Sequence, residues 1–156
     1  MGSPEFILVT TVLDNDGFLT AAWDQAIATG KENMMAIHGK VGGTWSDIVP
    51  LETDNVAPDL TSELAYPQLA VDAQGSVLVV WTKKINDTTW GAYARRLQGT
   101  EWQPQVELGK KSNLQAQDPV VAVADSGFGA SAFEYYDSSG KTTDPDVYNV
   151  EVAFCR

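Results

Sequence analysis

The chain has 156 residues, a formal net charge of −11 and a single cysteine. Its length suits one domain with its own core, and no apolar run approaches the roughly 18 residues that a membrane-spanning helix needs. The acidic charge argues against nucleic acid and anionic membranes as partners, and the lone Cys155 can form neither a disulfide within the chain nor a metal cluster.

The first six residues, Met-Gly-Ser-Pro-Glu-Phe, have the sequence of a cloning scar, so we expect the domain at 7–156. A β-branched segment at 7–13 predicts a strand. The Asp-Asn-Asp-Gly sequence at 14–17 predicts a tight turn, because Gly17 permits a positive φ and Asp or Asn bonds its own backbone. The same pattern occurs in calcium loops. No further acids stand at a suitable spacing, however, so we expect no metal and no cofactor.

The first unit continues after this turn with three more predicted strands. The second strand ends at Trp23, and the polar segment 24–33 is expected to be a loop. Further strands are expected at 34–41 and 45–51. The acidic stretch 52–64 then reads as a linker to the next unit.

The middle unit, which begins at 66, has the most regular sequence. Its run Val-Leu-Val-Val-Trp at 77–81 does not alternate with polar residues, and this predicts a strand that is buried on both faces. A polar loop is expected at 83–89, followed by strands at 90–97 and 102–108.

The last unit follows a linker at 109–118 and begins with a hairpin at 119–133. The segment 134–146 is expected to be a long loop, and it contains two adjacent tyrosines and several acids. A third strand is expected at 147–155, which leaves this unit without a fourth strand.

The three hairpins share one spacing. Each is centred on a glycine with an aromatic residue six positions later, at Gly17 and Trp23, Gly75 and Trp81, and Gly127 and Phe133. Two of the units add a Trp about 28 residues after the glycine. Repeats of four short strands predict propeller blades. We therefore expect an all-β fold of about three antiparallel four-stranded blades, the last incomplete, at about 7–58, 66–110 and 119–156.

The pattern P-x-x-x-x-D-x-x-G-x-x-x-x-x-W, followed by a G-x-x-W strand, resembles the sialidase-like β-propeller repeats of bacterial secreted and surface proteins. The resemblance covers the chain from Ile7 onward and implies a secreted or cell-surface location. It departs from sialidase Asp-boxes, in which the Asp-Gly turn lies between the third and fourth strands of a blade. Here that turn lies between the first and second strands.

Three blades do not close a propeller, which typically has four to eight. The chain is therefore expected to be part of a longer propeller, or to close by self-association of two copies into six blades, or to receive its missing strand from a partner. Self-association is the favoured interpretation, because a soluble chain must cover the apolar faces of its outer blades.

Three functions compete. The favoured one is a non-enzymatic binding module that holds a glycan or a protein on its loop rim. A structural part of a larger surface propeller is the second. A sialidase-type glycoside hydrolase is the third, but it needs a cluster of arginines, and Arg95 and Arg96 are adjacent on one strand and must point to opposite faces. The only histidine, His38, lies on a strand with no nucleophile at a recognisable spacing, so no catalytic residue is assigned.

Aromatic rings beside carboxylates are common in sites for sugars and cations, and loops after the second strands carry both. The candidate ligand-binding residues are Asp24, Lys83, Asp87, Trp90, Tyr135, Tyr136, Asp144 and Asp146. Trp90 is included because no other unit has a counterpart to it. The aromatic residues at repeated positions are instead expected to form the core between blades: Trp23, Trp81, Phe133, Trp45 and Trp102.

Overall fold

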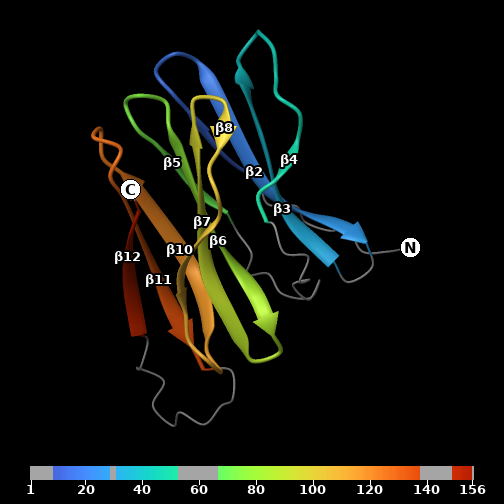
Figure 1. Ribbon diagram of the computed structural model, residues 1–156, viewed down its shortest axis with the longest axis vertical. Coiled ribbons are helices and arrows are strands. Elements are labelled where there is room, and N and C mark those ends of the chain that lie inside the picture. Colours follow the sequence, from blue (N-terminus) through green and yellow to red (C-terminus); the bar gives the residue numbers. More distant parts are fainter. Residues whose placement is uncertain (1–8, 29–30, 53–66, 138–148, 156) are drawn as a thin grey trace.

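The computed structural model describes residues 9–28, 31–52, 67–137 and 149–155. The described part is all-β, with twelve strands and no helix, as the sequence predicts. The strands form three antiparallel sheets, here called sheets I, II and III, which follow one another along the chain and lie side by side (Figure 1).

Sheet I contains β1 (Val9–Leu13), β2 (Phe18–Ala28), β3 (Lys31–Lys40) and β4 (Val49–Pro50), paired in chain order. The prediction of a polar loop at 24–33 is wrong, because β2 and β3 continue pairing as far as Ala28 and Lys31. Cross-strand hydrogen bonding overrides the polar composition here. The predicted fourth strand at 45–51 is reduced to an isolated bridge and the two residues of β4.

Sheet II contains β5 (Gln68–Val71), β6 (Val77–Asn86), β7 (Thr89–Gln98) and β8 (Glu101–Trp102), and β9 (Val106–Lys110) also pairs with β7. The expected loop at 83–89 is again mostly strand, because the ladder runs on to a tight turn after Asn86. The expected fourth strand at 102–108 is split into β8 and β9. Pro104 lies between the two, and proline has no N–H to donate to a ladder.

Sheet III contains β10 (Gln115–Val123), β11 (Gly129–Tyr136) and β12 (Asn149–Cys155). β10 begins inside the segment expected to be a linker, and β11 extends two residues past Glu134 into the segment expected to be a loop. β12 occupies the predicted third strand.

The tight turns predicted at the three glycines are confirmed. Gly17, Gly75 and Gly127 have φ values of 82°, 79° and 79°. In the first two turns the Oδ1 atom of Asp14 or Asp72 accepts hydrogen bonds of 2.8–2.9 Å from the backbone N–H groups two and four residues later. The third turn has Ala124 in place of the aspartate and keeps the same backbone hydrogen bonds.

Neighbouring turns contact one another at one end of the structure (Figure 1). A Cβ atom on Gly75 would lie 2.9 Å from Asp14 Oδ2 of sheet I, and one on Gly127 would lie 3.4 Å from Asp72 Oδ2 of sheet II. One carboxylate oxygen thus holds its own turn while the other approaches the glycine of the following sheet.

This contact predicts different costs for the same substitution at two glycines. Gly17→Ala meets no atom within 4 Å, so it should cost only the left-handed strain, about 1 kcal/mol of unfolding free energy. Gly75→Ala should cost about 2 kcal/mol, because the added methyl also collides with a carboxylate that two hydrogen bonds hold in place. Denaturant unfolding of both variants measures the difference, and equal losses would contradict the contact between turns.

Sheet II separates the core into two parts. It is buried on both faces, as the unbroken apolar run of β6 predicts. Val77, Val79 and Trp81 pack in one cluster with residues of sheet I, which include Ala22, Met34 and Leu51. The intervening residues Leu78 and Val80 pack with Val121, Val123 and Cys155 of sheet III. Alternate side chains of β6 therefore hold together two separate interfaces.

The core prediction for the repeated aromatic residues is confirmed only in sheets II and III. Trp81 and Phe133 are fully buried, and Trp102 is half-buried against the cluster between sheets I and II. Trp45 is 47% exposed, so the prediction is wrong for this residue, and Trp23 is only half-buried. Both lie on the face of sheet I that points away from sheet II.

Candidate binding site

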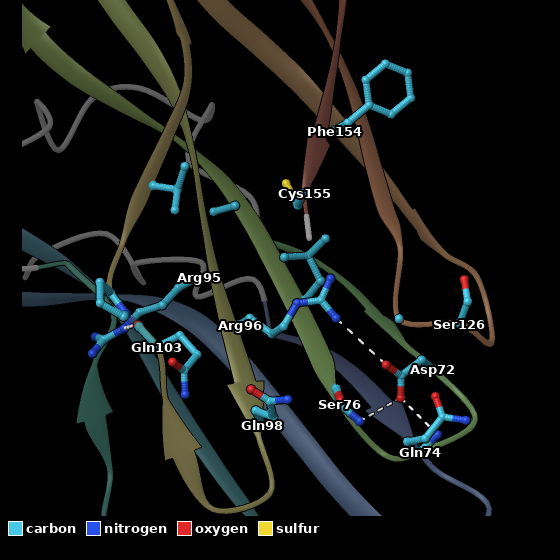
Figure 2. Close-up of a pocket in the computed structure, with 15 residues that line it drawn as sticks. Asp72, Gln74, Ser76, Arg95, Arg96, Gln98, Gln103, Ser126, Phe154 and Cys155 are labelled. Atoms are coloured by element: carbon cyan, nitrogen blue, oxygen red, sulfur yellow. Dashed lines mark hydrogen bonds and ion pairs between the residues drawn. The ribbon is translucent and has the colours of Figure 1, made fainter.

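A pocket with a volume of about 670 Å³ opens between sheets II and III, at the end that carries the three glycine turns. Its wall includes Asp72, Gln74 and Ser76 around the second turn, Ser126 of the third turn, and Arg96 of β7 (Figure 2). Phe154 contributes to the rim, but its ring points away from Arg96. The lining therefore combines amides, hydroxyls and the side chains of Arg95 and Arg96 with apolar side chains such as Leu78 and Val106.

Arg96 is the distinctive residue of this pocket. It is paired across the ladder with Leu78, which places both side chains on the face of sheet II toward sheet III. Its Nη1 atom lies 3.7 Å from Asp72 Oδ2, and the two side chains are only 12% and 2% exposed. The Nε and Nη2 atoms of Arg96 are buried and have no hydrogen-bond partner among the described residues. Two of the three nitrogen atoms of Arg96 therefore have donor capacity that no described residue uses.

The two carboxylate oxygens of Asp72 have different contacts. Oδ1 closes the turn through Gln74 N and Ser76 N, at 2.9 Å each, so it is fixed in place. Oδ2 then faces both Arg96 and the glycine of the third turn. The turn thus orients the carboxylate that balances the charge of the guanidinium.

Arg95 points to the opposite face, as its place next to Arg96 predicts. Its Nε atom donates to Gln103 O at 2.6 Å, and its Nη1 atom donates to Pro50 O and Leu51 O of sheet I at 3.0 and 3.2 Å. Burial lowers the pKa of Arg95 from its usual value. This guanidinium therefore ties sheet II to sheet I, whereas the guanidinium of Arg96 pairs with Asp72 on the side of sheet III.

The position in sheet I that corresponds to Arg96 of sheet II is occupied by a histidine, His38. His38 stands opposite Thr20 on the ladder, as Arg96 stands opposite Leu78, and its Nδ1 atom lies 2.8 Å from Thr20 Oγ1. Its ring stacks on Phe18 with 5.3 Å between centroids. Burial lowers the pKa of His38, and the nearby charge of Asp14 partly offsets this effect. His38 occupies the position in sheet I that Arg96 occupies in sheet II, and its ring already has a hydrogen-bond partner and a stacking partner.

Cys155 is the one cysteine in the pocket lining. Burial raises the pKa of the Cys155 thiol, with a smaller opposing effect of Arg96, so the thiol stays protonated at neutral pH and is a poor nucleophile. Across residues 9–28, 31–52, 67–137 and 149–155, no three His, Cys, Asp or Glu side chains gather where they could hold a metal ion. The arrangement is suited to donating hydrogen bonds to a bound oxygen-rich group.

None of the six proposed residues that the structure describes lines this pocket. Lys83, Asp87 and Trp90 come together in the β6–β7 hairpin, but Lys83 and Trp90 are each 3% exposed. The Lys83 ammonium lies 3.8 Å from the buried Glu52 carboxylate. Asp87 is exposed and forms an ion pair with Lys84 at 3.2 Å. A ligand at this hairpin would therefore meet Asp87 rather than the two buried side chains.

The other proposed residues are dispersed. Tyr135 is 2% exposed and Tyr136 is 45% exposed, since successive residues of β11 point to opposite faces of sheet III. Asp24 is half-buried on β2. Asp144 and Asp146 lie outside the described residues. The set proposed from the sequence does not include Arg96, although two signals pointed to it: its position next to Arg95 on one strand, so that the two side chains point to opposite faces, and the burial of that strand on both faces.

Tyr135 has an unusual environment at the end of sheet III remote from the turns. Lys111 Nζ lies 4.3 Å from the centre of its ring and 2.9 Å from Glu151 Oε2. Burial, with the charges of Glu151 and Glu107, raises the pKa of Tyr135 to about 12. The folded chain therefore retains a proton that the unfolded chain releases near pH 10. Tyr135 thus adds stability that is complete below pH 10 and is lost as the pH rises toward 12.

An ultraviolet titration of phenolate absorbance tests this environment. We expect one tyrosine of the folded chain to ionise near pH 12. Tyr135→Phe should remove this step, whereas Tyr136→Phe should leave it in place. A titration in which Tyr135→Phe removes a step near pH 10 instead would contradict the described burial.

No protein-family model matches the chain, and no curated protein matches it. Among the residues that the structure describes, no helix is long and apolar enough to cross a membrane.

Proposed function

We propose that this chain is a binding module without catalytic machinery, and that it takes its ligand in the pocket at Arg96. The observation that carries the proposal is the buried guanidinium group, which has two nitrogen atoms without a partner at the wall of an open pocket. Leaving such donors without acceptors costs free energy, so a ligand that supplies acceptors gains affinity from them.

The architecture supports the interpretation of the sheets as propeller-type blades, like those that the sequence resembles. The first strand of each sheet contacts the first strand of the next, β1 with β5 and β5 with β10. Thr10 Oγ1 donates to Pro67 O at 2.8 Å across the first of these junctions. Sheets whose first strands meet around a common centre are the arrangement expected of neighbouring blades.

A glycan is the ligand class that best fits the lining. The guanidinium of Arg96 and the nearby amides of Gln74, Gln98 and Gln103 offer many hydrogen-bonding groups within one pocket. A sugar presents hydroxyl and ring oxygens at a similar density. We therefore place glycans ahead of protein ligands for this pocket, and we propose no hydrolysis of the glycan there.

A glycan array followed by titration calorimetry tests the proposal. We expect Arg96→Gln to weaken binding of any glycan hit at least about tenfold, which corresponds to about 1.4 kcal/mol. Lys84→Gln is the matched control, because Lys84 pairs with Asp87 at the β6–β7 hairpin and does not line the pocket, so its change should leave the affinity within about twofold. An array without hits, or a hit whose affinity survives Arg96→Gln, would contradict the pocket assignment. Turnover of a fluorogenic sialoside would contradict the absence of catalysis.

A further inference from the structure

The outer face of sheet III, which points away from sheet II, exposes a row of apolar side chains on β12, with Glu134 of β11 beside Val150 at one end. On β12 the side chains of Val150, Val152 and Phe154 are 67%, 54% and 68% exposed. Across the ladder from Val152 and Phe154 lie Ala132 and Ala130 of β11. Exposed apolar patches of this kind mark sites of protein association.

The outer face of sheet I has the same character. Its ladder places Val9 beside Trp23 and Leu13 beside Leu19, and Trp45 bridges to Gly39 at the same edge. Val9, Leu13 and Trp45 are 54%, 58% and 47% exposed. The chain has a net charge of −11, yet none of these residues is charged, which matches the depletion of charge at the centre of protein interfaces.

These two faces correspond to the two sides of an interface that already exists inside the chain. Counting from the turn glycines aligns Trp23 with Trp81 and Phe133, and aligns Ala22 with Val80 and Ala132. Trp81 packs in the cluster that contains Ala22 of the preceding sheet. Trp23 is thus the equivalent of a side chain that docks on a preceding sheet, and Ala132 is the equivalent of the small residue that receives it.

We infer that the occupant of both faces is a second copy of this chain. The outer face of sheet III in one copy packs on the outer face of sheet I in the other, so that Trp23 lies over Ala132 as Trp81 lies over Ala22. A matching junction on the other side closes a ring of six sheets from two copies. Six lies within the range of four to eight blades that propellers use.

Like faces would not pair as well. If two copies met through sheet III alone, Ala132, Val152 and Phe154 of one copy would face the same side chains of the other, and Trp23 would take no part in the contact. If they met through sheet I alone, Trp23 would face another Trp23. Only the junction of unlike faces repeats the packing observed between sheets I and II.

This inference concerns the outer faces of sheets I and III, and its readout is dimerisation rather than glycan binding, so it stands or fails apart from the proposed function. Phe154 also contributes to the rim of the pocket at Arg96, whereas Val152 and Leu13 do not. The test is sedimentation velocity of the full chain and two variants over a range of concentrations. The unmodified chain should form a dimer. Phe154→Glu on sheet III and Leu13→Lys on sheet I should each weaken dimerisation at least about tenfold, because each places a charge in both junctions of the ring.

The decisive sample is a mixture of the two variants. One junction of the mixed dimer combines two unmodified faces, and the other brings the new glutamate and lysine to facing surfaces. Mixing should therefore restore dimers that neither variant forms alone. Val41→Glu, at a 59% exposed position in a turn of sheet I outside both faces, is the control and should dimerise normally.

Three results would overturn the inference: a monomeric unmodified chain, a variant that still dimerises alone, or a mixture that stays monomeric. In particular, persistent dimers of Leu13→Lys alone would indicate pairing through sheet III with itself. Circular dichroism checks that each variant is folded, and Val152→Glu replaces Phe154→Glu if the latter fails this check, since it changes the same face.

Discussion

Replacing Trp81 with alanine should lower the free energy of unfolding by about 4 kcal/mol, the largest effect we expect from a single substitution. Trp81 is fully buried on β6, stacks with Tyr93 at 6.3 Å between ring centroids, and belongs to the cluster that joins sheets I and II. Removing the indole leaves a cavity between the sheets, and rigid strands on both sides limit how far it can collapse.

The matched variant for this prediction is Trp81→Phe. It keeps an aromatic ring in the cluster, so we expect a loss of about 1–2 kcal/mol. Urea unfolding followed by circular dichroism measures both variants at equal protein concentration. A loss below about 1 kcal/mol for Trp81→Ala would mean that the indole is not in the core.

Replacing Asp72 with alanine should cost about 3 kcal/mol, because it removes the charge that balances Arg96 as well as two hydrogen bonds of the turn. Asp14→Ala is the matched control. Asp14 makes the same two turn bonds, and no arginine is paired with its carboxylate among the described ion pairs. We expect a loss of about 1–2 kcal/mol for this control.

A double variant separates the ion pair from the turn. Once Asp72 is replaced, changing Arg96 to methionine removes the unbalanced buried charge, so Asp72→Ala with Arg96→Met should be more stable than Asp72→Ala alone. Chemical denaturation of the four chains gives the coupling. Additive losses would show that Arg96 does not depend on Asp72.

The sequence was sufficient for the features that depend on local chemistry. The turns at Gly17, Gly75 and Gly127 follow from the need for a positive φ, and in two of them from an aspartate that bonds its own backbone. The burial of β6 on both faces follows from its unbroken apolar run. The all-β class and the order of the hairpins follow from these signals together.

The features that depend on pairing between strands could not be predicted from the sequence in the same way. Polar residues such as Gln25 and Asn33 stand opposite each other in the β2–β3 ladder, and composition alone assigns them to a loop. Trp90 has no counterpart in the other units, yet it is buried, because its place is set by the ladder with Lys84. The site at Arg96 needs the contact of two sheets, which no single segment encodes.

The central claim is that sheet II lies between sheets I and III and is covered on both faces. Nuclear Overhauser effects from β6 test it most directly. Leu78 methyl protons should show cross-peaks to the α-protons of Gly129 in sheet III, because a Cβ atom added to Gly129 would lie 2.6 Å from Leu78 Cδ2. Val79 and Trp81 should show cross-peaks to Met34 or Leu51 of sheet I. Observing both sets is the predicted result, and absence of either set in a folded sample would contradict the arrangement.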